Sequence, residues 1–263
     1  MEYYAGIDSG STYIKMAVLD QDKKLVTYRI APTGINGKKT VNEVRESICS
    51  ELNIDLSGIN GTVATGYGRR MIENITGNVT EIKAHASGAR WNGIGGKNIR
   101  TVIDIGGQDC KVINLDESGE IENFVMNDKC AAGTGRFLEA LARVLEMDIS
   151  NLGPLSLESS NPCSINSTCV VFAESEVISL LARGEDIRDI IAGIHASMAG
   201  RISRMAGKSG IEPEILLTGG GGMNPGLRSA FEEEFIQDIH VSEFPQLNGA
   251  IGAAIIAMRN NGF

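Results

Sequence analysis

Short apolar runs separated by turn residues open the chain, and they are typical of strands. The pattern predicts a three-stranded meander in which the turn Asp8–Thr12 joins the first two strands. A stretch with helical spacing, another apolar strand and a second helical stretch follow. The predicted elements of this part are strands Tyr3–Ile7, Ile14–Leu19, Lys24–Arg29 and Gly61–Thr65, and helices Thr40–Leu52 and Ile82–Trp91.

The strand pattern restarts after the glycine-rich segment 93–96. Strands are predicted at Thr101–Ile105, Lys111–Leu115 and Ile121–Met126. In both copies the first strand carries an aspartate at its end, Asp8 or Asp104, with a glycine shortly after. A repeat of this kind predicts two duplicated lobes. Lobe I is expected to contain residues 1–95 and the C-terminal helix 247–263, and lobe II residues 96–246.

Helical spacing dominates the second half of the chain. The stretch Ile187–Met205 carries its apolar residues along one stripe, which predicts packing against a core. The last segment is rich in glycine and alanine and predicts a closely packed helix. The predicted elements are helices Gly135–Glu146, Glu174–Ala182, Ile187–Met205 and Gly249–Arg259, and a final strand Glu214–Thr218. Strands and helices in both halves predict an α/β fold.

The composition narrows the partners and the location. A chain of 263 residues with 42% hydrophobic content can bury one large core or two small ones. Its formal net charge of −9 opposes binding to a polyanionic backbone, so nucleic acid is not an expected partner. No charged and apolar leader opens the sequence, and the run Gly249–Met258 is far shorter than the ~20 residues that span a bilayer. We therefore expect a cytoplasmic protein with no membrane partner.

Two glycine-containing turns have the composition of phosphate-binding loops. In the first hairpin the backbone N–H groups of Gly10–Thr12 can point at phosphate oxygens, and the hydroxyls add donors. Gly106 and Gly107 offer the same arrangement in the second copy. Asp8 and Asp104 are then expected to face one Mg²⁺ ion, directly or through its water shell.

A third loop, Thr218–Gly222, ends a strand and is expected to lie against adenine and ribose. Two other nucleotide motifs do not fit. Gly37–Thr40 is predicted to be a surface turn, because the first glycine of a P-loop falls on Pro32. The dinucleotide fingerprint that begins at Gly133 has Leu138 at its third glycine position. Each loop alone has the composition of an ordinary turn, and the order of all three along the chain favours an ATP site.

The order of these loops resembles that of the actin, Hsp70 and sugar-kinase superfamily over the full length of the chain. The resemblance implies two RNase H-like lobes with ATP or ADP in the cleft between them. We assign Asp104 to orienting the attacking water, with Gln108 beside it. The residues assigned to the nucleotide and Mg²⁺ are Asp8, Gly10, Ser11, Thr12, Lys15, Gly106, Gly107, Gly133, Thr134, Gly219, Gly220, Gly221 and Gly249.

Longer motifs resemble the activators of 2-hydroxyacyl-CoA dehydratases, a family that also includes ATPase subunits of benzoyl-CoA reductases. The matching stretches are Ala64–Arg69, Val102–Asp109, Met126–Leu138, Ser167–Cys169 and Val171–Ile178. In this family the cysteines that match Cys130 and Cys169 hold a [4Fe–4S] cluster shared between two subunits. The resemblance implies a homodimer with one such cluster. It also implies ferredoxin or flavodoxin as electron donor, and an iron–sulphur dehydratase or reductase component as partner.

The cysteines themselves support part of this interpretation. An odd count of five without a C-x-x-C pair indicates thiols or metal ligands rather than disulfides. Cys130 and Cys169 are each predicted to stand just before a helix, where the dipole favours a thiolate. A two-fold dimer doubles these two ligands into four. Cys163 stays open as a bystander or a substitute ligand, Cys49 and Cys110 are expected to be core thiols, and the three histidines receive no role.

These features predict an ATPase that uses MgATP to drive one low-potential electron onto an iron–sulphur partner. A small-molecule kinase of the same superfamily is an alternative, although the chain lacks an obvious insertion for a sugar pocket. A non-redox assembly ATPase of the actin type is a second alternative, and it would polymerise and contain no iron. The sequence does not identify the substrate of the partner enzyme.

Overall fold

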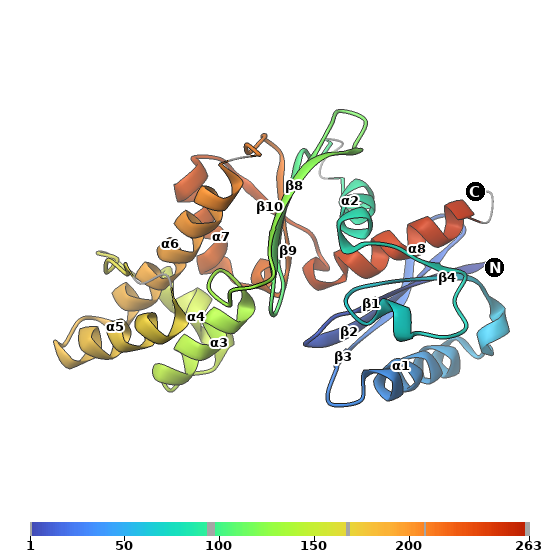
Figure 1. The fold of residues 1–263 in the computed structure, drawn as a ribbon, viewed down its shortest axis with the longest axis horizontal. Coiled ribbons are helices and arrows are strands. Elements are labelled where there is room, and N and C mark those ends of the chain that lie inside the picture. Colours follow the sequence, from blue (N-terminus) through green and yellow to red (C-terminus); the bar gives the residue numbers. More distant parts are fainter. Residues whose placement is uncertain (1, 94–97, 167–168, 208, 261–263) are drawn as a thin grey trace. The chain divides into compact units, whose positions relative to one another are not determined.

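The computed structural model describes residues 2–93, 98–166, 169–207 and 209–260. The chain divides into two compact units, which Figure 1 draws as one ribbon. Unit 1 comprises Met1–Asn98, Glu117–Ile121 and Gln246–Phe263, and unit 2 comprises Ile99–Asp116 and Glu122–Pro245. The predicted lobe boundary between residues 95 and 96 lies outside the described residues, as do Ser167 and Thr168. Among the described helices, none combines the length and apolar character needed to cross a membrane.

A five-stranded sheet forms the centre of unit 1, in the order β3-β2-β1-β4-β5. The first three strands are an antiparallel meander, as predicted, whereas β4 runs parallel to β1 and β5 parallel to β4. The register places Asp8 opposite Lys15 on one side and opposite Thr65 on the other. The strands are β1 Tyr3–Ser9, β2 Tyr13–Asp20, β3 Leu25–Pro32, β4 Ile59–Thr65 and β5 Gly77–Asn78.

Helices cover both faces of this sheet. The buried apolar residues of α1 (Gly37–Leu52) share a core with Ile7 of β1. On the other face α8 (Asn248–Asn260) packs along β1, β2 and β4, and α2 (Glu81–Trp91) packs beside α8 (Figure 1). The glycine and alanine residues of α8 allow this close packing, which confirms the predicted small-residue helix. Two short 3₁₀ turns, η1 Leu56–Gly58 and η2 Arg69–Met71, flank β4, and a third, η4 Pro245–Leu247, precedes α8.

Unit 2 repeats the same topology around its own sheet, in the order β8-β7-β6-β9-β10. β6 and β7 are antiparallel, while β9 runs parallel to β6 and β10 parallel to β9. Asp104 pairs with Lys111 on β7 and with Thr218 on β9. The strands are β6 Thr101–Ile105, β7 Cys110–Leu115, β8 Ile121–Asn127, β9 Ile215–Gly219 and β10 Ile239–Val241. The internal repeat of the sequence is therefore a repeat of strand order and of register.

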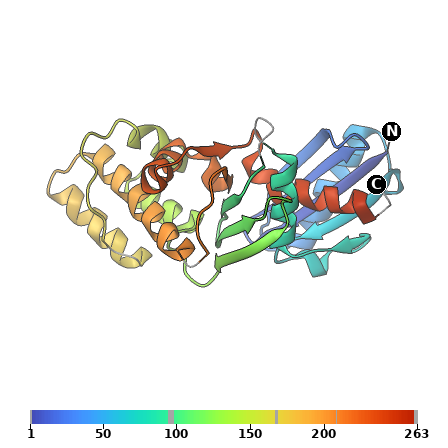
Figure 2. The same cartoon turned by 90° about the horizontal axis from the view of Figure 1, so that it is seen from above.

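Within the described residues, five α-helices accompany this second sheet. They are α3 Gly135–Val144, α4 Ile149–Ser156, α5 Val170–Ala182, α6 Ile187–Ala206 and α7 Pro225–Phe235. The apolar stripe of α6 is buried with Ile103 and Ile105 of the sheet, which confirms the predicted core face. α5 lies at the edge of unit 2 farthest from its sheet (Figures 1 and 2).

Four elements and several helix boundaries differ from the predicted pattern; α5, for example, begins at Val170 rather than at Glu174. The strands β5 and β10 and the helices α4 and α7 were not predicted. Glu214–Thr218 is not the final strand, because β10 follows it and pairs with β9. β5 has two residues and β10 has three, which is too few to produce an alternating pattern of apolar and polar positions. Gly37–Thr40 is the first turn of α1 rather than a surface turn, because the Asn36 side chain accepts the Lys39 N–H and caps the helix.

Candidate functional site

Asp8 lies at the end of β1 and is the centre of the predicted site in unit 1. The Asp8 residue is 7% exposed, and Lys15 Nζ lies 2.9 Å from Asp8 Oδ2. The cross-strand register brings these two residues together. At Gly249, the second residue of α8, a Cβ atom would lie 3.5 Å from the same carboxylate oxygen. The structure therefore brings together three of the predicted residues, and the positive end of a helix faces the carboxylate.

Hydrogen bonds hold the turn between β1 and β2, which consists of Gly10, Ser11 and Thr12. Thr33 Oγ1 donates to the Gly10 carbonyl at 2.8 Å, and the Thr33 N–H donates to the Thr12 carbonyl at 2.9 Å. Gly10 and Ser11 line a cavity of about 480 Å³ in unit 1. Among the described residues, Thr12 Oγ1 is buried and has no hydrogen-bond partner. A buried hydroxyl without a partner is costly, and a ligand that accepts its hydrogen bond removes that cost.

Asp104 occupies the equivalent position at the end of β6 in unit 2. Its carboxylate is 3% exposed and accepts a hydrogen bond from Thr218 Oγ1 at 2.8 Å. Lys111 Nζ lies 3.3 Å from Asp104 Oδ2 and 2.9 Å from Asp109 Oδ1. A buried cation flanked by two carboxylates keeps its charge compensated, and breaking such a pair costs about 3–5 kcal/mol. Gln108, predicted to assist Asp104, is exposed on the adjoining loop.

Lys111 is a site residue that the sequence analysis missed. Asp8 pairs with Lys15, and Asp104 pairs with Lys111, at the same positions of the two hairpins. The repeat in the sequence contained this signal, because aligning the two copies at their aspartates also aligns the two lysines. Each unit therefore presents the same aspartate–lysine pair at the end of its first strand.

His85, to which the sequence analysis assigned no role, lies close to Asp8. Asn248 Nδ2 donates to the His85 carbonyl and to His85 Nδ1, both at 3.1 Å. The carbonyl fixes the orientation of the amide, so Nδ1 accepts and the ring proton lies on Nε2. That Nε2 lies 3.2 Å from the position that a Cβ of Gly249 would occupy. No sequence spacing relates these residues, and only the packing of α2 on α8 brings them together.

The loop after β6 is tied to the start of α3. The Gly106 carbonyl accepts the Gly135 N–H at 2.8 Å, and the Gly107 carbonyl accepts the Arg136 N–H at 2.9 Å. Thr134 is the N-cap of α3 and is completely buried. These two hydrogen bonds connect the predicted phosphate loop to the first turn of α3.

The glycine loop after β9 also reaches Asp104. Gly219 has φ +77°, and a Cβ there would lie 2.3 Å from the Ile105 carbonyl oxygen and 3.0 Å from Asp104 Oδ1. Only glycine fits this conformation and this distance. Gly220 and Gly221 continue into the short helix η3 (Gly220–Met223). The predicted second phosphate loop and the predicted adenosine loop thus adjoin the same carboxylate.

The two predicted cluster ligands differ in local structure. Cys169 is exposed and is the N-cap of α5, as predicted. Cys130 is half-buried, and the prediction that a helix starts just after it is wrong. A hydrogen-bonded turn from Ala131 to Thr134 intervenes, and α3 begins only after Thr134. Asn127 holds this segment, because its Nδ2 donates to the Cys130 carbonyl at 2.7 Å and its Oδ1 accepts the Cys130 N–H at 3.1 Å. The helix-dipole argument therefore applies to Cys169 alone.

The other three cysteines are poor candidates for metal ligands. Cys49 and Cys110 are buried, as predicted, and burial raises the pKa of both thiols, that of Cys110 to about 11. Cys163 is half-buried, and its pKa is raised first by burial and then by the carboxylates of Glu185 and Asp189. A raised pKa disfavours the thiolate, which is the form that binds metals.

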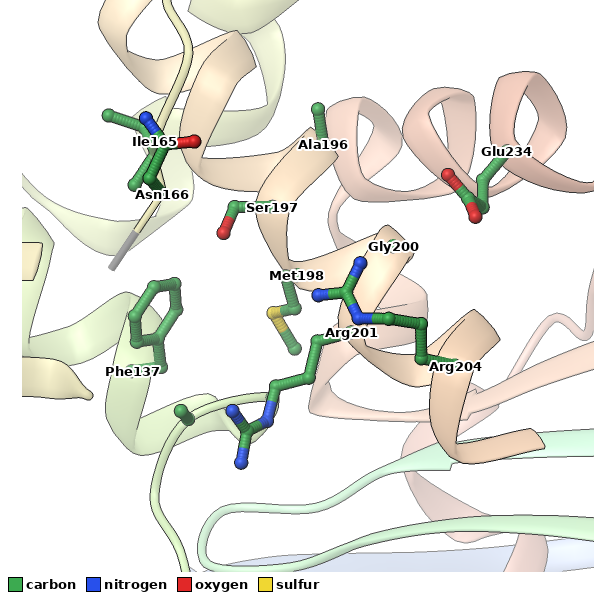
Figure 3. A pocket seen from close by; sticks show the side chains of 12 residues that line it. Phe137, Ile165, Asn166, Ala196, Ser197, Met198, Gly200, Arg201, Arg204 and Glu234 are labelled. Atoms are coloured by element: carbon green, nitrogen blue, oxygen red, sulfur yellow. The ribbon is translucent and has the colours of Figure 1, made fainter. Parts of the chain in front are cut away.

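A cavity of about 280 Å³ lies beside the Cys130 segment in unit 2 (Figure 3). Its lining includes Gly133, Asn166, Phe137 of α3, and Arg201 and Arg204 of α6. A Cβ atom added at Gly133 would lie 3.4 Å from Arg201 Cδ. Gly133, assigned to the nucleotide from the sequence, thus faces this cavity, whose charged lining residues are Arg201, Arg204 and Glu234. Within the described part of the chain, no three His, Cys, Asp or Glu side chains are grouped to hold a metal ion.

Comparison with known proteins shows that this chain is similar to ATPases. Residues 5–257 match the model of the BadF/BadG/BcrA/BcrD ATPase family. The (R)-2-hydroxyglutaryl-CoA dehydratase activating ATPase of Acidaminococcus fermentans is 44% identical over 260 residues, which cover 98% of this chain and 97% of that protein. The 2-hydroxyisocaproyl-CoA dehydratase activator of Clostridioides difficile is 42% identical over 255 residues, or 97% of this chain and 94% of that protein. A solved structure of the activator of the 2-hydroxyisocaproyl-CoA dehydratase from Clostridium difficile, with bound ADPNP, has a TM-score of 0.91 at 42% identity and covers 98% of this chain and 95% of that one.

Proposed function

Because the chain belongs to the BadF/BadG/BcrA/BcrD ATPase family, as its motifs predicted, we propose that it activates an iron–sulphur dehydratase or reductase by ATP-driven electron transfer. In this role it accepts one low-potential electron from ferredoxin or flavodoxin and passes it to the partner component. The observation that carries the proposal is the presence, in one chain, of two aspartate–lysine sites and an exposed cysteine at a helix N-terminus. The first feature is suited to nucleotide chemistry and the second to holding a thiolate-bound metal group.

The residues of each unit have distinct tasks in ATP hydrolysis. In unit 1, Asp8 would hold Mg²⁺, and Lys15 balances the negative charge of the Asp8 carboxylate. The Gly10–Thr12 turn would bind phosphate oxygens through N–H and O–H donors. In unit 2, Asp104 orients the attacking water. Thr218 and Lys111 hold its two carboxylate oxygens, so the carboxylate is positioned before the nucleotide arrives. Pre-set polar groups of this kind lower the barrier because they need no rearrangement during the reaction.

Cys169 fits a ligand of a [4Fe–4S] cluster by its exposure and its position at a helix N-terminus, and the half-buried Cys130 is the second proposed ligand. A cluster bound there supplies a store for one electron at low potential. Two thiolates per chain require a second copy to complete four ligands, so we propose a homodimer with one cluster. The surface of α5 supports this assembly. This helix begins directly after Cys169, and its exposed large apolar side chains are Val171, Phe172, Ile178 and Leu181.

Hydrolysis of ATP is coupled to the cysteine segment through unit 2 itself. Loss of the terminal phosphate changes the contacts of Gly106 and Gly107, whose carbonyls bind the first N–H groups of α3. The turn from Ala131 to Thr134 joins Cys130 to that helix. ATP and ADP therefore favour different positions of Cys130, which is the differential interaction that a coupled device needs.

ATP turnover is expected to proceed without any small-molecule acceptor. The chain should release inorganic phosphate from MgATP when it is alone in buffer, because water is the acceptor that Asp104 orients. Phosphate release and formation of a phosphorylated product are measured with a panel of sugars and small alcohols, added one at a time. A strict requirement for one of these acceptors, with transfer of phosphate to it, would favour a kinase over an activator.

A further inference from the structure

The motif Ala64–Arg69 ends β4 and has no part in the functions assigned so far. It folds against the first phosphate loop. The Gly68 N–H donates to the Ser9 carbonyl at 3.0 Å, and Arg69 Nη1 donates to the Gly66 carbonyl at 2.9 Å. Gly66 has φ +88°, and a Cβ there would lie 2.4 Å from the Ser9 carbonyl oxygen and 2.8 Å from Asp8 Oδ1. The motif therefore forms one wall of the Asp8 site. Residue 66 must be glycine, because any side chain there would collide with Ser9 and Asp8.

Thr65 stands at the point where this wall meets Asp8. The two residues are register partners on neighbouring parallel strands, so their side chains leave the sheet on the same face. Strands in a sheet lie about 4.8 Å apart, which places the hydroxyl of Thr65 within reach of a group held by Asp8. Thr65 is completely buried, and its Oγ1 has no hydrogen-bond partner in the described part of the chain.

A buried hydroxyl without a partner destabilises a protein unless a bound molecule uses it. The neighbouring threonine of the phosphate loop, Thr12, has the same property. The other buried threonines of the described residues have hydrogen-bond partners. Thr101 Oγ1, for example, donates to the Glu212 carbonyl at 2.9 Å and accepts the Glu212 N–H at 3.0 Å. Ser242 Oγ in unit 2 is also buried without a partner, so it is the position of the Thr65 hydroxyl beside Asp8 that points to a ligand oxygen there.

We propose that Thr65 is a binding residue of the nucleotide site, whose hydroxyl hydrogen-bonds an oxygen of the magnesium–phosphate group next to Asp8. This inference rests on the proposed ATPase function and adds to it a contact from β4. The oxygen belongs either to the terminal phosphate or to a water molecule on the Mg²⁺ ion. The two sources share one chemistry, because each presents an oxygen to a hydroxyl at the end of the strand.

Thr65→Val is the direct test, since valine keeps the shape and removes the hydroxyl. The ligand-free Val variant is expected to melt at the same temperature as the unmodified chain or higher, because a buried unsatisfied group has been removed. Its dissociation constant for magnesium-bound ADPNP should rise about tenfold to a hundredfold, the loss of one hydrogen bond to a charged group. Thr65→Ser should restore tight binding. Weaker binding of ADPNP alone indicates the terminal phosphate, and weaker binding of both ADPNP and ADP, only with Mg²⁺ present, indicates the metal's water.

Thr101→Val is the matched control, because it removes a buried hydroxyl whose hydrogen bonds are satisfied. It should lower the melting temperature and leave the ADPNP affinity unchanged. If Thr65→Val behaves in the same way, or fails to fold, Thr65 is a structural residue and the proposal is overturned. Failure of the unmodified chain to bind either nucleotide would instead contradict the proposed function, so the two failures are distinguishable.

Discussion

Serine at Cys169 or at Cys130 is expected to remove essentially all iron from the anaerobically prepared protein while nucleotide binding persists. Each substitution removes one thiolate per chain and therefore two of the four ligands of a cluster shared by two copies. The nucleotide residues Asp8 and Asp104 lie on β1 and β6, where their ion pairs are with Lys15 and Lys111. Iron and acid-labile sulphide are measured on each variant, and ADP affinity is measured on the same samples.

Cys163→Ser is the control for this experiment. Its thiol is half-buried, its backbone N–H donates to the Asp189 carbonyl, and burial raises its pKa. Iron content should therefore stay at the level of the unmodified protein. Loss of iron from the Cys163 variant together with retention in the Cys169 variant would show that the ligands have been wrongly assigned.

Asp104→Asn is expected to reduce ATP hydrolysis by at least about a hundredfold, the scale of losing one positioned polar group. The amide keeps the size of the side chain and can still accept the hydrogen bond of Thr218. Lys111 keeps its ion pair with Asp109, so the fold should survive. Phosphate release at saturating MgATP gives the rate, and iron content should be unchanged.

Asp109→Asn tests whether the loss is specific to Asp104. Like Asp104→Asn, it removes one negative charge that pairs with Lys111. The carboxylate of Asp109, however, has no role in the proposed reaction. A smaller loss of hydrolysis is expected. Near-normal activity of the Asp104 variant combined with a large loss in the Asp109 variant would transfer the catalytic role to Asp109.

Local pattern was sufficient for the framework of the fold. The meander of β1–β3 and its repeat in β6–β8 are predicted by short apolar runs between turn residues, and the α/β class with two lobes is confirmed. The same information did not reveal β10, whose three residues pair only because β9 lies beside them. The start of α7, in contrast, is marked in the sequence, because Asn224 is a typical N-cap residue and Pro225 is typical of a first helical position.

The sequence predicted the site residues that the internal repeat relates to one another. It did not predict the residues that only the packing of helices and strands brings together. Asp8 and Asp104 stand out as equivalent residues, and the same alignment also contained Lys111. His85 and Thr65 become neighbours of Asp8 only through α8 and β4, which no spacing in the sequence encodes. The position of Cys130 was misjudged for a similar reason, because the turn held by Asn127 depends on side-chain hydrogen bonds rather than on periodicity.

The iron content of the unmodified protein, purified without air, tests the central claim most directly. A homodimer that shares one cluster between Cys130 and Cys169 of two copies predicts about four iron atoms for every two chains. Iron is measured per chain, together with the mass of the particle in solution. Two iron atoms per chain in a dimer is the predicted result. Four per chain would contradict a shared site, and a nucleotide-binding protein with no iron after anaerobic purification would contradict the electron-transfer function itself.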